Sequence, residues 1–212
     1  MNEQRSAIFD QSIVINGGFS PADFRFDVFS SAGVLTREQI LAGSSFSPSL
    51  VSVLTKDVNL NINENMVAIS VRTGAEQIPL LDFILFVIKN SKGPIDLALN
   101  FGGYAFLDGT LENDSKIRFF KSDNLFQYKY FGTADSVYGF NATTFYKYTR
   151  FNLDVKPIQL VSNVTGEKRN ALTVFANFQV DGKLPALAVS NMLKDDYPLF
   201  VNHFKNVLGD II

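Results

Sequence analysis

Residues 79–108 constrain the fold most, because a fully apolar segment is followed there by an alternating one. Residues 80–88 (LLDFILFVI) are almost entirely apolar, residues 90–94 (NSKGP) are typical of a turn, and residues 95–101 (IDLALNF) alternate between large apolar side chains and smaller or polar ones. The first pattern is typical of a buried element and the second of a strand with one buried face. Residues 80–88 fit either a strand or a buried helix, and we favour the strand because the segment is short and rich in Phe, Ile and Val.

Further segments of the chain alternate in the same way and predict additional strands. The clearest pair is residues 58–62 and 67–71, which flank a turn and predict a hairpin, and residues 158–164 and 171–180 predict a second one. Strands are also predicted at residues 23–28, 116–121, 125–131 and 143–155. Eight or more short strands without a regular alternation of strand and helix predict an antiparallel all-β domain, most simply a jelly-roll-like β-sandwich.

Two short helices interrupt this pattern. Thr36 and Gln39 have the spacing of a capping box, which predicts a short helix at residues 37–42. Near the end of the chain, Phe200, Phe204 and Leu208 recur with the period of one helical face, and a helix is expected at residues 197–208.

The domain organisation follows from where the strand pattern begins. Residues 1–22 are polar except for the island Ile13, Val14 and Ile15, which is typical of an arm that becomes ordered only against another surface. Residues 23–212 form a single β-sandwich domain in this interpretation, and the C-terminal helix belongs to it.

The amino-acid composition excludes several classes of function. The chain of 212 residues contains 21 Phe, no Cys and 19% charged residues, with a net charge of −2. Lack of Cys excludes disulfides and thiolate chemistry, and the weak negative charge argues against a general nucleic-acid partner. No signal peptide is expected, because no apolar region follows a basic start, and no apolar run reaches the length of about 20 residues that a membrane-spanning helix needs.

The sequence contains only weak matches to catalytic or metal-binding sites. Asp57 begins a segment like an EF-hand loop, but Ile62 stands where the loop needs Gly and Ala68 where it needs Glu. His203 is the only histidine, which excludes a paired-histidine metal site. Acidic residues that could serve as paired carboxylates are Asp96, Asp108, Glu112, Asp123 and Asp154. Because no pattern pairs them, we expect no enzyme, no metal site and no cofactor.

Aromatic and basic residues interleave at residues 116–121, 127–130 and 146–150. A single-stranded nucleic-acid platform contains such residues, but with a net charge of −2 we interpret them as the outer faces of ordinary strands. An outer face of few charges is easily desolvated against a neighbouring subunit. The expected assembly contacts are Ile13, Val14 and Ile15 in the arm and Tyr146, Tyr148 and Arg150 on one strand face.

A Phe-rich and Asn-rich β domain with a terminal arm resembles the jelly-roll shell and vertex proteins of icosahedral viruses and tailless bacteriophages. The resemblance covers the whole chain in its number of strands, its terminal arm and its composition, and it includes no motif. It implies a virion structural protein that assembles with copies of itself and with other virion proteins, as a homo-oligomer located in the virion. The alternative is a receptor- or glycan-binding β module of a fibre, tail or adhesin.

Overall fold

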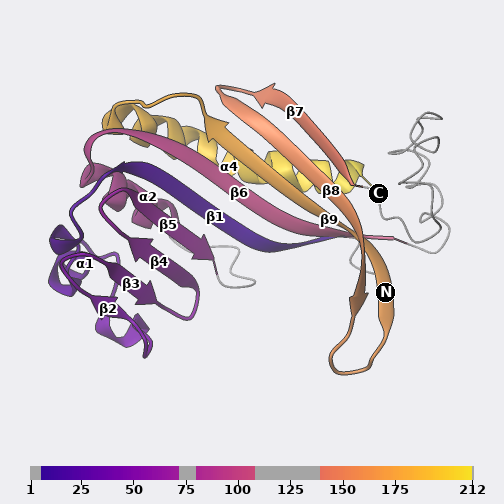
Figure 1. Ribbon diagram of the computed structural model, residues 1–212, viewed down its shortest axis with the longest axis horizontal. Coiled ribbons are helices and arrows are strands. Elements are labelled where there is room, and N and C mark those ends of the chain that lie inside the picture. The colour runs from indigo at the N-terminus through magenta and orange to yellow at the C-terminus, as the bar shows by residue number, and fades with distance from the viewer. Residues whose placement is uncertain (1–5, 72–79, 108–138, 212) are drawn as a thin grey trace, which may run out of the picture.

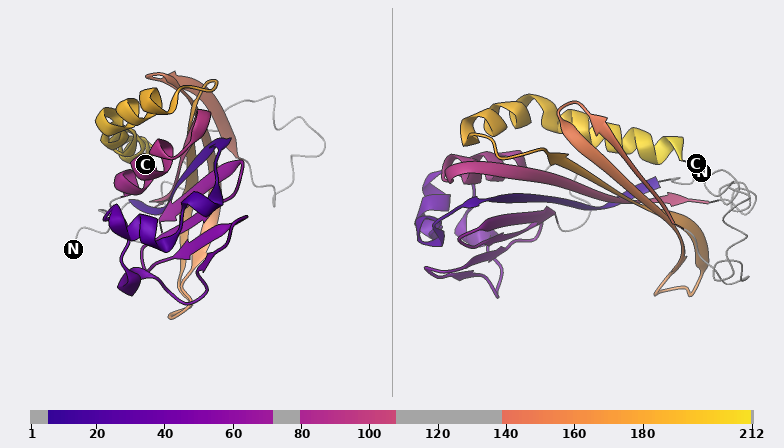
Figure 2. Two further views of the ribbon diagram at one scale, coloured as in Figure 1. Left: turned by 90° about the vertical axis from the view of Figure 1, so that its left-hand side faces the viewer. Right: turned by 45° about the horizontal axis from the view of Figure 1, so that its top comes forward.

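The chain folds around one long antiparallel sheet with helices on one of its faces (Figures 1 and 2). The computed structural model describes residues 6–71, 80–107 and 139–211. Their nine strands are ordered β2-β3-β4-β5-β1-β6-β9-β8-β7. The antiparallel β architecture is therefore confirmed. The described residues do not form the second sheet of a sandwich, and the helices occupy its place against the first.

The strands and helices have the following bounds. The strands are β1 (Ser6–Gly18), β2 (Ser45–Phe46), β3 (Val51–Leu54), β4 (Val58–Ile62), β5 (Met66–Val71), β6 (Lys92–Phe106), β7 (Phe140–Tyr146), β8 (Thr149–Val161) and β9 (Lys168–Val180). The helices are η1 (Pro21–Asp23), α1 (Phe26–Ser31), η2 (Arg37–Gln39), α2 (Leu80–Lys89) and α4 (Ala186–Asp210).

Strand β1 lies in the middle of the sheet, where the sequence predicts a separate arm. It pairs with β5 on one side and with β6 on the other. Ile13 and Ile15 are fully buried beneath the helices, opposite Leu99 and Leu97 of β6. The N-terminal segment is thus part of the core, and its removal would leave two strand edges without their partner.

Residues 80–88 form helix α2, so the prediction of a strand is wrong. Phe83, Ile84, Val87 and Ile88 are buried, and their spacing of one, three and one residues places them on one side of a helix. Phe86 packs on another side, with its ring 5.1 Å from that of Phe29 in α1. The segment is apolar nearly all round because it is packed on several sides, and periodicity alone does not distinguish such a helix from a buried strand.

The C-terminal helix is present and begins earlier than predicted. Helix α4 starts at Ala186, and its buried residues Val189 and Leu193 precede the Phe200, Phe204 and Leu208 stripe. Pro198 lies inside the helix and is exposed. The helix therefore continues past a residue that removes one backbone hydrogen bond and usually kinks or ends a helix.

The remaining predictions have mixed outcomes. The hairpins β4–β5 and β8–β9 are confirmed, and the short helix is confirmed as the single turn η2, where the side chain of Gln39 accepts a hydrogen bond from the backbone N–H of Thr36 at 2.7 Å. Residues 23–28 lie in η1 and α1 instead of a strand. The single strand expected at residues 143–155 is two strands, because Lys147 adopts a left-handed conformation (φ 53°) and turns the chain. The strands predicted at residues 116–121 and 125–131 lie outside the described residues.

Candidate functional site

The two faces of the sheet differ in composition because side chains alternate along each strand. In β6, Leu97, Leu99 and Phe101 are buried beneath the helices. Their neighbours Ala98 and Asn100 point to the opposite face. We call this opposite face, which none of the described helices covers (Figure 2), the open face.

Uncharged polar residues follow one line across the open face. In the strand register, seven residues from seven adjacent strands stand opposite one another in sequence: Asn59, Ser70, Ser12, Asn100, Asn177, Asn152 and Thr143. We call this line the polar row. Its residues come from positions 12 to 177 of the chain, so only the folded sheet brings them together.

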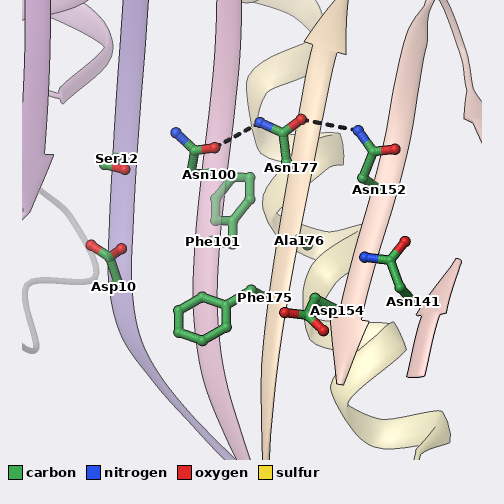
Figure 3. A pocket seen from close by; sticks show the side chains of 10 residues that line it. All are labelled: Asp10, Ser12, Asn100, Phe101, Asn141, Asn152, Asp154, Phe175, Ala176 and Asn177. Atoms are coloured by element: carbon green, nitrogen blue, oxygen red, sulfur yellow. Dashed lines mark hydrogen bonds between the residues drawn. The ribbon is translucent and has the colours of Figure 1, made fainter. Parts of the chain in front are cut away.

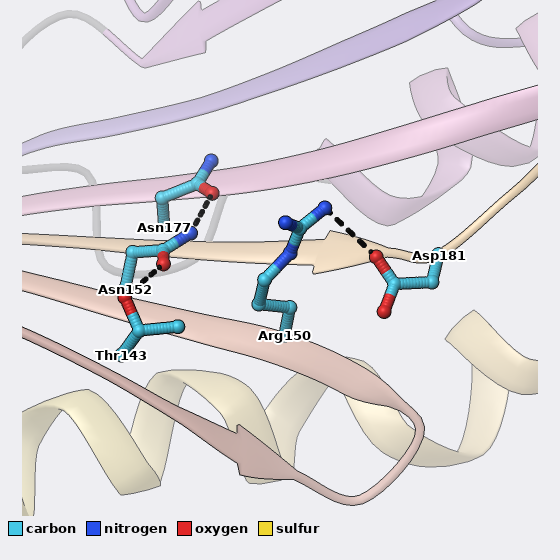
Figure 4. Close-up of polar contacts among 5 residues, drawn as sticks. All are labelled: Thr143, Arg150, Asn152, Asn177 and Asp181. Carbon is cyan, nitrogen blue, oxygen red and sulfur yellow. Dashed lines mark hydrogen bonds and ion pairs between the residues drawn. The ribbon is translucent and has the colours of Figure 1, made fainter.

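The C-terminal half of the polar row is joined by side-chain hydrogen bonds. The Thr143 hydroxyl donates to Asn152 Oδ1 at 2.9 Å, and Asn152 Nδ2 donates to Asn177 Oδ1 at 3.3 Å. Asn177 Nδ2 in turn donates to Asn100 Oδ1 at 2.7 Å (Figures 3 and 4). Each amide has two N–H groups and two lone pairs. The chain of bonds therefore orients the amides and leaves some of their hydrogen-bonding capacity unused.

A hollow of about 350 Å³ lies over this part of the row (Figure 3). Its lining residues are Asp10, Ser12, Asn100, Phe101, Asn141, Asn152, Asp154, Phe175, Ala176 and Asn177. They come from strands β1, β6, β9, β8 and β7, so a rigid sheet positions every one of them.

The next line of the sheet supplies carboxylates and an aromatic ring to the hollow. In register it runs Asp10, Gly102, Phe175, Asp154 and Asn141. Phe175 is 43% exposed although it is apolar, and it lies between the two carboxylates (Figure 3). The open face thus presents hydrogen-bonding groups around one accessible aromatic ring.

The two carboxylates of the hollow have different environments. Burial raises the pKa of Asp10 above its ordinary value, against a smaller opposite effect from the backbone N–H of Gln11. The Asp154 carboxylate accepts a hydrogen bond from Lys156 Nζ at 2.6 Å. Three strand spacings separate the two acids, a distance of about 14 Å between their strands. A pair of acids that hydrolyses a glycosidic bond is closer, at roughly 5 to 9.5 Å.

Phe9 supports the aromatic side of the hollow from a bulge in β1. The strand register shifts between Ile8 and Asp10, and the Phe9 ring lies 4.4 Å from the Tyr104 ring and 5.6 Å from the Phe175 ring. A Cβ atom at Gly102 would lie 2.9 Å from the Phe9 ring. Glycine at this position therefore makes room for the ring.

A second feature lies beyond the end of the sheet, in the β8–β9 hairpin. Among the described residues, the register pairing of β6 with β9 ends at Ala171 and is followed by one hydrogen bond from the backbone N–H of Leu107 to the backbone oxygen of Asn170 at 2.9 Å. The rest of residues 158–171 continues as a two-stranded hairpin in the part of the chain that the structure describes. We call these residues the projecting hairpin, because they extend away from the rest of the sheet (Figure 1). Three aliphatic side chains on it are exposed, by 38% at Ile158, 54% at Val161 and 94% at Val164.

The structure separates the residues predicted as assembly contacts. Ile13 and Ile15 are buried in β1 and are not surface residues in this fold, whereas Val14 between them points to the open face and is partly buried. Arg150 is exposed on the open face, where its guanidinium pairs with Asp181 at 2.9 Å (Figure 4).

Tyr146 and Tyr148 lie on the helix side of the sheet instead. The Tyr146 ring stacks on His203 at 3.9 Å, and the Tyr148 ring lies 5.9 Å from that of Phe200. Lys147 between them pairs with Asp196 of α4 at 2.8 Å. These two tyrosines attach the β7–β8 turn to helix α4.

Other candidates from the sequence do not converge on the open face. His203 packs between α4 and the sheet, where burial lowers its pKa. Asp57 lies in a turn before β4, and the described residues contain no group of three or more potential metal ligands. The aromatic and basic segments at residues 116–121 and 127–130, together with Asp108, Glu112 and Asp123, lie outside the described residues.

No local motif in the sequence marks the residues of the polar row as a site. A signal exists, since Asn59 and Asn61 alternate with apolar residues, as do Asn100 and Asn177. Alternation predicts which residues face solvent, but only the strand order shows that they adjoin.

Comparison of this chain with protein-family models, with curated proteins and with solved structures gives no match. Separately, none of the helices in the described ranges is long and apolar enough to cross a membrane. Function must therefore be argued from the surface itself.

Proposed function

We propose that this protein is a structural subunit of a virion, which acts by assembling with copies of itself and with other virion proteins. The projecting hairpin is the observation that carries the proposal. A two-stranded hairpin is marginally stable in water, and this one exposes the aliphatic side chains of Ile158, Val161 and Val164. Contact with a neighbouring subunit would cover these side chains and order the hairpin.

The outer edge of the sheet supports the same proposal. Strand β7 is an end strand of the described sheet, and its sequence FNATTFY contains no charged residue and no proline. Edge strands that avoid pairing with other chains usually carry such residues or are very short. At the opposite edge, β2 has only two residues. In the described sheet, the long edge strand without charge or proline therefore lies beside β8, the strand that enters the projecting hairpin.

Low surface charge favours association as well. Only 19% of the residues are charged, and a polar surface without charge loses less hydration energy when another subunit covers it. The resemblance in composition to virion shell proteins has the same physical basis. The protein would not need to catalyse a reaction or hold a cofactor to perform this function.

Charge introduced on the projecting hairpin tests the proposal. We expect the unmodified protein to form oligomers in sedimentation velocity, and the double variant Val161→Lys, Val164→Lys to sediment as a folded monomer, because two lysines cannot be buried in an apolar contact. Leu187→Lys is the matched control, since Leu187 is 73% exposed and lies on α4. That variant should assemble like the unmodified protein.

A shortened hairpin gives an independent test. Ile158 and Ala171 are register partners, so replacing residues 159–170 with Asn-Gly joins them through a two-residue turn suited to a hairpin. The sheet should fold and assembly should be lost. A protein that is monomeric at every concentration, or one whose assembly survives both changes, would refute the proposal.

A further inference from the structure

We propose that the hollow on the open face binds a neutral saccharide. The proposal is independent of self-assembly, since the projecting hairpin and β7 edge support assembly, whereas the lining of the hollow supports binding.

The hydrogen-bonding groups of the hollow match those of sugar hydroxyls. Every hydroxyl both donates and accepts, and an amide offers both functions on adjacent atoms. The side chains of Asn100, Asn177 and Asn152 are aligned by their own hydrogen bonds, so they are oriented before a ligand arrives. Such preorganisation lowers the entropic cost of binding.

The Phe175 ring supplies the apolar contact that a saccharide also requires. One side of a pyranose ring carries several C–H groups, which pack against an aromatic face. Phe175 is accessible, lies between Asp10 and Asp154 (Figure 3), and is held by the Phe9 ring at 5.6 Å. A sugar ring on Phe175 would have carboxylate acceptors at both sides and the row of amides along a third.

The same residues disfavour other ligands. Asp10 and Asp154 repel an anion such as a phosphate or a sulfated sugar, and Lys156 is paired with Asp154. An apolar ligand would cover the Asn amides without satisfying them, which costs free energy. A metal ion would need a cluster of ligands, and none occurs among the described residues.

The size of the hollow is appropriate for one or two sugar rings. Its volume of about 350 Å³ lies near the lower end of the range of about 300 to 1,000 Å³ for small-molecule sites. The hollow opens on a sheet face, so a longer chain could extend along the polar row toward Ser12 and Ser70.

The first experiment measures binding to an array of neutral, sialylated and sulfated glycans. We expect a subset of the neutral glycans to bind. For the best of them, titration calorimetry should show that Phe175→Ala weakens binding by about fivefold or more, which corresponds to about 1 kcal/mol. Phe145→Ala is the matched control, because Phe145 is 71% exposed on the same face and does not line the hollow. It should change the dissociation constant by less than about twofold.

A second pair of variants tests the amides. Asn177→Ala removes the central amide of the hydrogen-bonded chain and should weaken binding by about tenfold, whereas Asn59→Ala alters the same row outside the hollow and should leave binding unchanged. Binding should persist in the Val161→Lys, Val164→Lys protein, which separates this proposal from assembly. Absence of any bound neutral glycan, a preference for the charged glycans, or equal losses in Phe175→Ala and Phe145→Ala would overturn it.

Discussion

The open face and the helix-covered face of the sheet are built from the same strands and have opposite properties. Neighbouring residues show the contrast: Asn100 and Phe101 in β6, Asn152 and Phe151 in β8, and Asn177 and Phe178 in β9. The three amides stand in the polar row, whereas the Phe101 and Phe151 rings lie 5.7 and 4.6 Å from Phe178 beneath helix α4. Period-two alternation thus places the buried rings on one face and the amides on the other.

The largest expected effect comes from the centre of the covered face. Phe178 is fully buried, and rings from β6, β7, β8 and α4 surround it, with Phe200 of α4 at 5.1 Å. Phe178→Ala should lower the free energy of unfolding by about 3 to 5 kcal/mol, because it removes a buried ring and leaves a cavity. Denaturation by urea, followed by circular dichroism, measures the change.

The neighbouring residue provides the control on the open face. Asn177→Ala removes two side-chain hydrogen bonds from a part-buried position, and each such bond contributes about 1 kcal/mol. Its loss of stability should therefore be about 1 to 2 kcal/mol, because water can reach the groups left behind. Equal losses in the two variants would contradict the assignment of stability to the covered face.

Two adjacent glycines, Gly102 and Gly103, allow the same comparison between the two faces, with a smaller expected change in the free energy of unfolding. A Cβ atom at Gly103 would lie 2.7 Å from Leu208 of α4 and 3.1 Å from the backbone oxygen of Ala7. Leu208 is buried and cannot withdraw, so Gly103→Ala should cost about 1 to 3 kcal/mol through overpacking.

Gly102→Ala tests the other face at the next position. The added methyl would lie 2.9 Å from the end of the Phe9 ring and 3.1 Å from the Asp10 Cβ, on the face that no described helix covers. Stability should change by less than about 1 kcal/mol, partly because alanine reduces the freedom of the unfolded chain. Thermal unfolding of both variants gives the difference, and a larger loss at Gly102 than at Gly103 would show that the open face is the more tightly packed one.

The sequence predicted which residues face the core better than it predicted the order of the strands in the sheet. Alternation in residues 58–62 and 95–101 correctly separates buried residues from exposed ones, because local side-chain direction depends only on the strand itself. The position of β1 depends instead on partners about 50 to 100 residues away. A polar segment with one short apolar run is therefore predicted as a terminal arm, although it forms the central strand of the sheet.

The candidate site was less predictable for the same reason. The polar row joins Ser12 to Asn177 through pairings between distant strands, and no local motif contains that information. Helix α2 was misassigned because a segment packed on several sides loses the periodicity that distinguishes a helix. The projecting hairpin was predicted as a hairpin, but its extension beyond β6 follows from the different lengths of adjacent strands.

The smallest expected effect is the response to pH, and its sign should differ between the two faces. On the covered face, burial against Tyr146 and Phe151 lowers the pKa of His203 below 6.5. As the pH falls below about 6.5, the unfolded chain therefore takes up a proton more readily than the folded chain, and stability decreases until the lowered pKa has been passed. His203→Gln should remove this decrease.

On the open face, burial raises the pKa of Asp10 above 3.8. The folded chain then takes up the proton first as the pH falls, so this group adds stability in acid, and the gain is complete once the pH is below 3.8. Urea titrations of the unmodified protein, His203→Gln and Asp10→Asn across this range should give differences of opposite sign, with the histidine difference appearing at the higher pH. Differences of the same sign would mean that the two groups do not experience the environments that the covered and open faces give them.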